Sequence, residues 1–389
     1  MVENITPEEV QDRIDNDDPL QIVDVRNEGD FASSQIPTAE NIPLHDLEDE
    51  IDEVDWEDEI AVVCAVGKSS QQAAKMLEAS DETGDATIAN VEDGMEGWNH
   101  RAWAQAEIQT DNDDLELIQL QRRATGCLAY MVGSKSAGEA AVIDATRHPD
   151  MYQEVAEEAG YEITSVFDTH IHADHLTGGR ILAEEVDATY YASKFVETRD
   201  PEFEYTPLDR NEVIQVGDID IKSVYTPGHT TDMSSYLVED EALMTGDTIF
   251  VESIGRTELQ FTGDGAKDGA RTMYETLHGT VMSMPDSIKI LPAHFSVRPD
   301  GTAIDVTPGE PIQATVGYLR KHNNVLQLPE EEFVEHMFDN LPSKPPNYEQ
   351  IIETNLGHRE PEDEDEARQL EMGPNSCAAS EESMVSDDD

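Results

Sequence analysis

Short apolar runs, each followed by a polar turn, recur along the chain. Residues 60–64 (Ile-Ala-Val-Val-Cys) precede a glycine-containing turn and the helix-like segment 71–77. Residues 163–168 (Ile-Thr-Ser-Val-Phe-Asp) precede a second such turn, and the runs 242–244 and 288–290 also end in turns. Short apolar runs bounded by turn residues are typical of buried strands. The pattern therefore predicts strand–turn units in both halves of the chain.

Ligand-type side chains are concentrated in the turn that follows the predicted strand at 163–168. His170, His172, Asp174 and His175 fall within six consecutive positions. A strand-to-helix turn brings such side chains together at the carboxyl edge of a sheet. A soluble chain rarely holds this density of imidazoles and carboxylates without a metal ion, so the turn predicts a metal site.

Three later segments each add one ligand-type side chain at the end of a predicted strand or in a turn. They are residues 226–230 with His229, residues 245–248 with Asp247, and residues 291–294 with His294. Imidazole nitrogens and carboxylate oxygens are ligands for zinc and iron. The seven candidates therefore predict one metal centre.

This order of motifs resembles the metallo-β-lactamase superfamily over residues 115–295. The resemblance implies a four-layer αββα sandwich with the metal at one edge. Residues 172–178 (His-Ala-Asp-His-Leu-Thr-Gly) and 253–259 (Ser-Ile-Gly-Arg-Thr-Glu-Leu) are similar to the persulfide dioxygenase branch, as are residues 332–334 and 341–355. The superfamily contains both hydrolases and oxygenases, so the fold alone does not name the reaction.

The resemblance to persulfide dioxygenases implies one Fe(II) per chain, with His170, His229 and Asp247 as ligands. Two imidazoles and one carboxylate on one face of Fe(II) leave positions open for dioxygen and a second substrate. The other candidates would orient these ligands and handle protons, with Asp174 and His175 as catalytic residues; they are His172, Asp174, His175 and His294. In the alternative, all seven hold two zinc ions about 3.5–4 Å apart, which suits thioester hydrolysis of the glyoxalase II type. The ligands themselves suit either metal, and only the sequence of the surrounding segments favours iron.

A second candidate site lies where the apolar run 60–64 ends in Cys64. A strand, a tight turn and a helix place the sulfur above backbone N–H groups at a helix N-terminus, which stabilises a thiolate and holds an anion. The expected sulfur- and anion-binding loop is Ala65, Val66, Gly67, Lys68, Ser69 and Ser70. The apolar run alone would also fit a buried structural cysteine.

The surrounding segment, residues 5–104, resembles a single rhodanese domain. The similar segments are the capping box 6–9 (Thr-Pro-Glu-Glu), the strand 21–26, the loop 36–43, the C-x-x-G-x-x-S loop 64–70 and the glycine–tryptophan segment 94–98. The C-x-x-G-x-x-S loop has the length used for sulfur transfer. The resemblance therefore implies a thiosulfate sulfurtransferase with Cys64 as nucleophile.

The 389 residues suffice for two or three hydrophobic cores. The expected organisation is an α/β rhodanese-like domain at 1–106, a polar linker at 107–114, a metallo-β-lactamase-fold αββα domain at 115–300, a helical extension at 301–358 and an acidic, mobile tail at 359–389. The fold class is therefore α/β in the first domain and α+β in the second.

Acidic residues dominate the charge of the chain: 86 aspartates and glutamates against 24 lysines and arginines give a formal net charge of −62. Such a surface repels nucleic-acid phosphates and anionic membranes, so we expect binding to neither. An acidic excess spread over the whole chain is typical of proteins from halophiles that accumulate salt. We therefore expect a halophilic protein.

The three cysteines, Cys64, Cys127 and Cys377, are too few and too odd in number for a disulfide framework. The first residues lack the basic region and apolar core of a signal peptide, and no apolar run approaches the ~20 residues of a membrane span. We expect a soluble, cytoplasmic protein, and a homo-oligomer is compatible with the sequence. Cys127 is expected to pack within an apolar strand, whereas for Cys377 sulfur relay and no role both stay open.

The two candidate sites together predict a bifunctional sulfur-metabolising enzyme. At the metal, a low-molecular-weight persulfide would be oxidised (R-S-S⁻ + O₂ + H₂O → R-SH + sulfite), and Cys64 would exchange sulfur with thiosulfate or sulfite. Arg256 is the candidate partner of a substrate carboxylate, because the guanidinium group pairs with that group through two hydrogen bonds. The alternatives are a dinuclear zinc thioesterase with a rhodanese domain, and a non-catalytic protein that relays or senses persulfides.

Salt should stabilise this fold. Raising the ionic strength from about 0.1 M to about 1 M shortens the screening length from about 10 Å to about 3 Å, so repulsion between surface carboxylates weakens. We expect the midpoint of thermal unfolding to rise steeply up to about 1 M potassium chloride and more slowly beyond it. A midpoint that stays constant between low and multimolar salt would contradict the halophilic interpretation.

Overall fold

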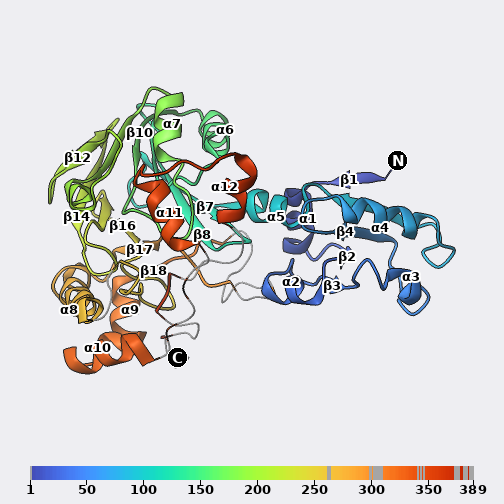
Figure 1. Cartoon of the computed structure of the whole chain (residues 1–389). Helices are drawn as coiled ribbons and strands as arrows, with labels where there is room; N and C mark the ends of the chain where they lie inside the picture. The colour runs from blue at the N-terminus through green and yellow to red at the C-terminus, as the bar shows by residue number, and fades with distance from the viewer. Residues whose placement is uncertain are drawn as a thin grey trace.

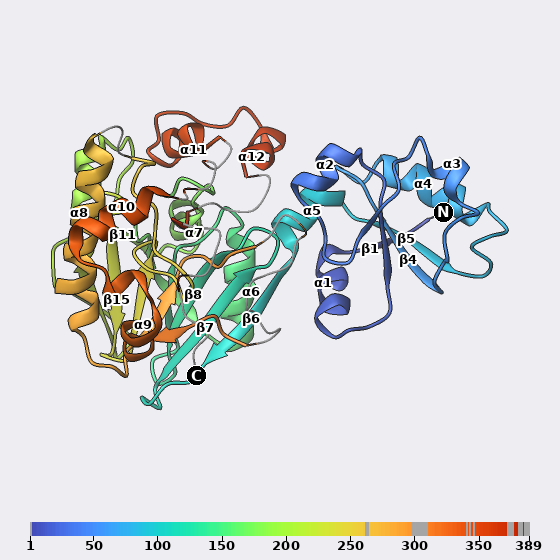
Figure 2. The same ribbon diagram turned by 90° about the horizontal axis from the view of Figure 1, so that it is seen from below.

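The computed structural model (Figure 1) describes residues 2–260, 264–297, 300, 310–339, 341, 344, 347–371, 377–379 and 384. Two domains lie side by side, and both views show the N-terminal domain attached through its last helix to a larger C-terminal domain (Figures 1 and 2). Within the described residues, no helix combines the length and apolar character needed to cross a bilayer.

The N-terminal domain is built on a five-stranded parallel sheet of order β1-β5-β4-β2-β3. Its strands are β1 (Glu3–Ile5), β2 (Gln21–Asp24), β3 (Glu40–Asn41), β4 (Glu59–Val63) and β5 (Thr87–Val91). Its helices are α1 (Pro7–Asp15), α2 (Glu28–Ser33), α3 (Leu47–Glu50), α4 (Ser69–Glu78) and α5 (Gly94–Arg101).

Successive residues of β4 explain why both faces of this sheet are covered. Val62 packs in one buried cluster with Ala73 and Leu77 of α4. Ala61 and Val63 point the other way, into a cluster that contains Trp98 of α5. A parallel strand that is buried on both faces reads as one continuous apolar run, which is the pattern seen at 60–63.

The predicted capping box at the start of α1 is confirmed. The Glu9 backbone N–H donates to Thr6 Oγ1 at 3.1 Å, and the Thr6 backbone N–H donates to Glu9 Oε2 at 2.9 Å. Two amide groups that the helix leaves unpaired at its N-terminus are thereby satisfied.

The C-terminal domain contains two sheets that face each other. The seven-stranded sheet has the order β12-β11-β10-β9-β8-β7-β6, and the six-stranded sheet has the order β13-β14-β15-β16-β17-β18. The first comprises β6 (Trp103–Ile108), β7 (Leu115–Arg122), β8 (Cys127–Ser134), β9 (Glu139–Ile143), β10 (Glu162–Phe167), β11 (Thr189–Ser193) and β12 (Thr206–Leu208). The second comprises β13 (Val213–Val216), β14 (Ile219–Tyr225), β15 (Ser234–Val238), β16 (Ala242–Gly246), β17 (Lys289–Pro292) and β18 (Ala314–Thr315).

Helices cover the outer face of each sheet. They are α6 (Pro149–Ala159) and α7 (Gly179–Glu185) on the first sheet, and α8 (Asp264–Gly279), α9 (Val316–His322) and α10 (Glu330–Asp339) on the second. Short 3₁₀ turns lie at η1 (Lys194–Arg199), η2 (Val281–Ser283) and η3 (Val325–Gln327). Between the sheets, Tyr130 and Phe167 of the first meet Tyr236 and Met244 of the second. The expected αββα sandwich is confirmed.

The chain enters the second domain earlier than expected. Strand β6 pairs antiparallel with β7 from Trp103↔Arg122 to Ile108↔Leu117, so residues 103–108 belong to the larger sheet. The expected boundaries were the end of the first domain at 106 and a linker at 107–114. The polar residues of β6 were misleading because β6 is an edge strand whose side chains alternate between solvent and core.

The described part of the expected mobile tail is ordered against the sandwich. Helix α12 (Glu364–Leu370) buries Ala367 and Leu370 against two residues of the sandwich domain. They are Leu176, in the turn after β10, and Ile351 of α11 (Tyr348–Asn355). The sequence did not indicate this helix because acidic residues occupy its exposed face and leave only a narrow apolar stripe. The first part of the expected helical extension, residues 301–309, lies outside the described residues.

Candidate metal centre and sulfur-transfer loop

Strand ends of both sheets converge on one edge of the sandwich. His170 to His175 follow β10, His229 follows β14, Asp247 follows β16 and His294 follows β17. All are buried except Asp174, whose residue is partly exposed although its side chain is not. The structure therefore brings the predicted ligand segments together, as the order of strands and turns suggested.

His170, His229 and Asp247 form a compact group of three donors. The Asp247 Oδ2 atom lies 3.7 Å from His170 Nε2 and 3.4 Å from His229 Nε2. Within the described part of the chain these three atoms have no hydrogen-bond partner, although the side chains are fully buried. Ligands about 2.1 Å from one metal lie roughly 3–3.5 Å from each other. The three side chains therefore fit a divalent metal ion.

Neighbouring groups orient these ligands. The ring N–H at His229 Nδ1 donates to the Arg256 carbonyl oxygen at 2.6 Å, which leaves Nε2 as the free lone pair. Burial lowers the pKa of His170 and His229, so both imidazoles are neutral and able to bind a metal. Burial raises the pKa of Asp247, but the neighbouring His294 imidazole lowers it by a larger amount and keeps the carboxylate charged.

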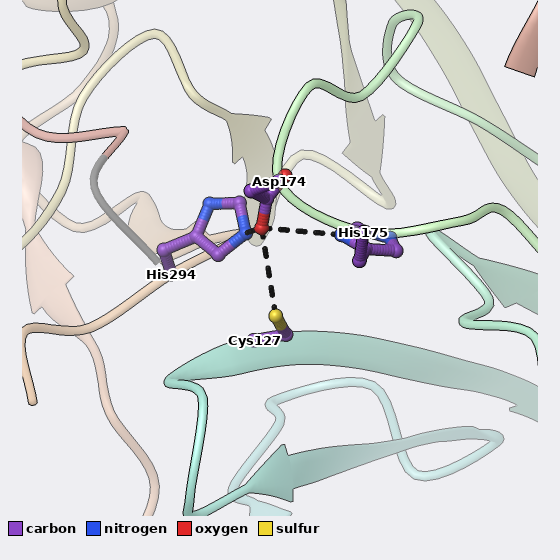
Figure 3. Close-up of side chains that lie close together, drawn as sticks. All are labelled: Cys127, Asp174, His175 and His294. Atoms are coloured by element: carbon purple, nitrogen blue, oxygen red, sulfur yellow. Dashed lines mark hydrogen bonds and ion pairs between the residues drawn. The ribbon is translucent and has the colours of Figure 1, made fainter. Parts of the chain in front are cut away.

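A second group of donors surrounds the Asp174 carboxylate (Figure 3). Asp174 Oδ2 lies 2.7 Å from His294 Nε2 and 3.2 Å from His175 Nδ1, and it accepts the Cys127 thiol at 3.5 Å. His294 also links the two groups, because its Nδ1 lies 2.6 Å from Asp247 Oδ1. The predicted residues Asp174, His175 and His294 are thus adjacent to the three-donor group.

Cys127 is a residue of the site that sequence reasoning missed. It was expected to serve only packing, and it is buried in β8 as expected, but its thiol points at Asp174. An isolated antiparallel bridge pairs Cys127 with His294. That contact joins residues far apart in the sequence, so no local pattern could have revealed it.

His172 and Arg256 lie differently from the other predicted residues. His172 Nε2 lies 3.2 Å from Asp144 Oδ1, and these two residues group with Asp168 instead of with either set of donors. Arg256 is only 1 % exposed and its guanidinium forms an ion pair with Glu258. A free substrate carboxylate would have to compete with that glutamate.

The Cys64 loop connects β4 to α4. Gly67 adopts φ +70° within it, and Gly94 at the start of α5 adopts φ +59° beneath it. A Cβ atom at Gly94 would lie 2.1 Å from the Cys64 carbonyl oxygen, so only glycine allows this approach. The Met95 backbone N–H then donates to the Cys64 carbonyl at 2.8 Å, which fixes the loop on α5.

The predicted loop residues surround the Cys64 sulfur with donors. The Ser70 hydroxyl lies 3.1 Å from Cys64 Sγ and 2.6 Å from Asn90 Oδ1, so its single proton can serve either acceptor. Burial raises the pKa of the Cys64 thiol, but hydrogen bonds from the Ser70 hydroxyl and from the backbone N–H groups of Ser70, Val66 and Ser69 outweigh it. The net result is a pKa below the ordinary value. Ala65, Val66, Lys68 and Ser69 are exposed, which leaves the loop accessible to an anion.

Fold and site together define a two-domain protein in which a thiol-bearing α/β domain precedes an αββα sandwich with a buried metal-ligand edge. The rhodanese-like domain family matches residues 6–101, and the metallo-beta-lactamase superfamily matches residues 122–294. The chain therefore consists of a rhodanese domain followed by a metallo-beta-lactamase domain, and it is homologous to persulfide dioxygenases.

Individual relatives agree with this assignment. The mitochondrial persulfide dioxygenase ETHE1 of Mus musculus is 26% identical over 58% of this chain and 82% of its own length. The hydroxyacylglutathione hydrolase of Dictyostelium discoideum is 33% identical over 34% of this chain and 48% of its own. The crystal structure of ETHE1 from Myxococcus xanthus is 26% identical and superposes with a TM-score of 0.51 over 61% of this chain and 95% of its own.

Replacing the loop cysteine should separate the two domains functionally. In Cys64→Ser the weakly acidic hydroxyl cannot replace the thiolate nucleophile, so transfer of sulfur from thiosulfate to cyanide should fall to background. Oxidation of a preformed persulfide should persist, because the metal ligands belong to the other domain. Thiocyanate formation at the wild-type rate would contradict the assignment of Cys64.

The pH dependence of sulfur transfer should reveal the role of Ser70. Removing its hydroxyl in Ser70→Ala takes away the strongest stabilisation of the thiolate, so the pKa of Cys64 should rise and the rate should increase only at higher pH. Ser69→Ala is the matched control, because Ser69 contributes through its backbone N–H and its profile should stay closer to wild type. Coinciding profiles for Ser70→Ala and wild type would argue against this role.

Proposed function

We propose that this chain oxidises a low-molecular-weight persulfide to sulfite with dioxygen at one Fe(II), and that its rhodanese domain transfers sulfane sulfur through Cys64. The proposed metal ligands are His170, His229 and Asp247. When bound, Fe(II) would supply the site at which dioxygen and the persulfide sulfur are brought together. The balanced reaction is R-S-S⁻ + O₂ + H₂O → R-SH + SO₃²⁻ + H⁺.

The contrast between the two donor groups carries the proposal of a single metal. In the three-donor group the ligand atoms stand 3.4–3.7 Å apart and make no hydrogen bonds with one another. Around Asp174, in contrast, His294 and His175 approach one carboxylate oxygen to 2.7 Å and 3.2 Å. The 2.7 Å contact between His294 Nε2 and Asp174 leaves less room for a second ion than the separations in the three-donor group leave for the first. Asp174 Oδ1, His175 Nε2 and His294 Nε2 nevertheless also have no hydrogen-bond partner among the described residues.

The residues around Asp174 suit proton handling in this reaction. Burial lowers the pKa of His175 and His294, but the Asp174 carboxylate raises it by a larger amount. The net pKa of both imidazoles therefore lies well above the ordinary value. His294 can therefore hold a proton between Asp174 and Asp247, which it contacts through different ring nitrogens. We assign Asp174 and His175 to the proton balance of the reaction, consistent with their predicted catalytic roles.

A dinuclear zinc thioesterase is the second candidate. Cys127, Asp174, His175 and His294 offer four buried side-chain donors within 4.8 Å of one another, which is sufficient for a second metal. Hydroxyacylglutathione hydrolases are also among the relatives. Coverage does not separate the two classes, because ETHE1 matches over 58% of this chain and 82% of its own length and one hydroxyacylglutathione hydrolase over 55% and 89%. The dioxygenase is favoured because residues 172–178 and 253–259 are similar to the persulfide dioxygenase branch. A protein that only relays or senses persulfides is the third alternative, and turnover would exclude it.

Asp247→Ala should abolish metal retention and oxygen uptake together. The substitution removes the only charged member of the three-donor group, so iron affinity should fall by at least about 100-fold, the upper range for outer-sphere partners. Protein purified without oxygen in high salt would be analysed for metals and then for oxygen uptake with several low-molecular-weight persulfides.

Asp113→Ala is the matched control, since Asp113 is an exposed carboxylate of the same domain. It should keep about one iron per chain and the wild-type oxygen uptake. Two tightly bound zinc ions with thioester hydrolysis and no oxygen uptake in the wild-type protein would overturn the proposal in favour of the thioesterase.

A further inference from the structure

The metal loop, defined as residues 169–177, connects β10 to the turn before α7 and has little backbone hydrogen bonding of its own. Among the described residues, residues 170–175 form no backbone–backbone hydrogen bond, and the first bridge to a neighbouring segment comes at Thr177. Buried N–H and carbonyl groups are costly when they stay unpaired. Side chains from other elements therefore decide how this loop is held.

The first half of the loop is held by two carboxylates of the sandwich. Asp144, which follows β9, accepts the Thr169 backbone N–H at 2.7 Å. Asp232, in the turn between β14 and β15, accepts the Ile171 backbone N–H at 2.8 Å. These two bonds lie on either side of His170, so they fix the backbone that carries this proposed ligand.

The second half of the loop is held by an amide side chain from the C-terminal helices. Asn355, the last residue of α11, is 1 % exposed, and its Nδ2 donates to the carbonyl oxygens of His172 and His175 at 3.0 Å and 2.8 Å. Its Oδ1 accepts the Thr177 backbone N–H at 3.0 Å. Because a carbonyl only accepts and a backbone N–H only donates, these three partners fix the orientation of the amide.

A buried carboxylate adds a fourth bond to the same half of the loop. Glu371, which follows α12, accepts the Leu176 backbone N–H at 2.7 Å through Oε1. Its Oε2 accepts from Arg147 Nε at 2.8 Å, so the charge of Glu371 is paired. The C-terminal helices thus bond the loop before and after Asp174, whose carboxylate points to His175 and His294 (Figure 3).

We propose that Asn355 is a positioning residue that sets Asp174 and His175 for proton handling and leaves the metal ligand His170 to the sandwich. The inference rests on the proposed function, because it divides one loop between the two tasks named there. The carbonyls that Asn355 binds stand on either side of Asp174 in the chain, so one amide group closes the loop around that carboxylate.

Iron content and turnover should therefore separate in Asn355→Asp. Aspartate keeps the shape of the side chain but presents oxygen in place of N–H to the two carbonyls, so the loop should open around Asp174. We expect about one iron per chain, as in the wild type. For oxygen uptake with a free persulfide, kcat should fall at least about 100-fold, the lower range of what a positioned proton donor or acceptor contributes, with KM largely kept.

Thr354→Ala is the matched control on the same helix. The Thr354 hydroxyl donates to the Gln350 carbonyl within α11, so its loss should leave iron content and kcat near the wild-type values. Wild-type kcat in Asn355→Asp would overturn the proposal. A loss of iron in that variant as large as its loss of kcat would also overturn it, since the amide would then hold the ligand as well.

The opposite pattern is expected from the first half of the loop. Arg199 Nη1 donates to Asp232 Oδ1 at 3.0 Å, so Asp232→Ala would be combined with Arg199→Leu to leave no buried charge unpaired. The Ile171 N–H loses its acceptor, and iron affinity should fall at least about tenfold, as for other groups that orient a ligand. Equal effects of this double variant and Asn355→Asp on iron affinity would show that the loop moves as one body, against the proposal.

Hydrogen exchange of the metal-free protein tests the contact without turnover. In Asn355→Ala the Thr177 N–H loses its acceptor, so peptides that cover residues 172–177 should exchange faster than in the wild type, while peptides that end before residue 172 stay unchanged. Asn355→Asp would be measured beside it, and melting midpoints would show that both variants fold. Unchanged exchange at 172–177 in both would overturn the proposal. Absence of oxygen uptake with every free persulfide in the wild type would contradict the proposed function, while the exchange pattern would still decide whether Asn355 holds this half of the loop.

Discussion

The Asp247 carboxylate is the point on which the site depends, because each of its oxygens serves a different group. Oδ2 faces His170 and His229 without a hydrogen bond, and Oδ1 is bonded to His294 at 2.6 Å. The backbone is equally constrained, since a Cβ atom at Gly255 would lie 1.7 Å from the Asp247 carbonyl oxygen. A buried charge in this position is costly unless it is paired, so the surrounding imidazoles and the proposed ion are conditions for the fold as well as for chemistry.

The succession of strand and turn along the chain explains which parts of this site the sequence could predict. Each candidate ligand such as Asp247 follows a short apolar strand, and strands of this kind place their following residues at one edge of a sheet. Cys64 could be predicted for the same reason, because strand, loop and helix are consecutive. Cys127 and Cys377 could not be assigned, since they reach the site through a bridge to His294 and through bonds to residues 254–256. Such contacts depend on how distant segments meet, and one sequence does not encode them as a pattern.

The acidic composition also obscured two boundaries of the fold. Strand β6 and helix α12 each bury one face, but their exposed faces carry so much charge that the segments resemble a linker and a tail. In a chain with net charge −62 the polar face of every element is acidic, so high local charge no longer distinguishes loops from amphipathic elements. The spacing of the remaining apolar residues, such as Ala367 and Leu370, is the more reliable signal.

Two buried arginines near the contact between the domains lie close to one buried carboxylate. Arg147 and Arg122 are 7 % or less exposed at their side chains and both approach the buried Glu371, at 2.8 Å and 4.0 Å. These two arginines are therefore placed where water and salt reach poorly, whereas other cations such as Lys194 and Arg320 form exposed ion pairs that salt screens. Added salt should thus relieve surface repulsion more than it weakens the contact at Glu371. We therefore expect the contact between the rhodanese domain and the metallo-beta-lactamase domain to persist in salt that screens the acidic surface.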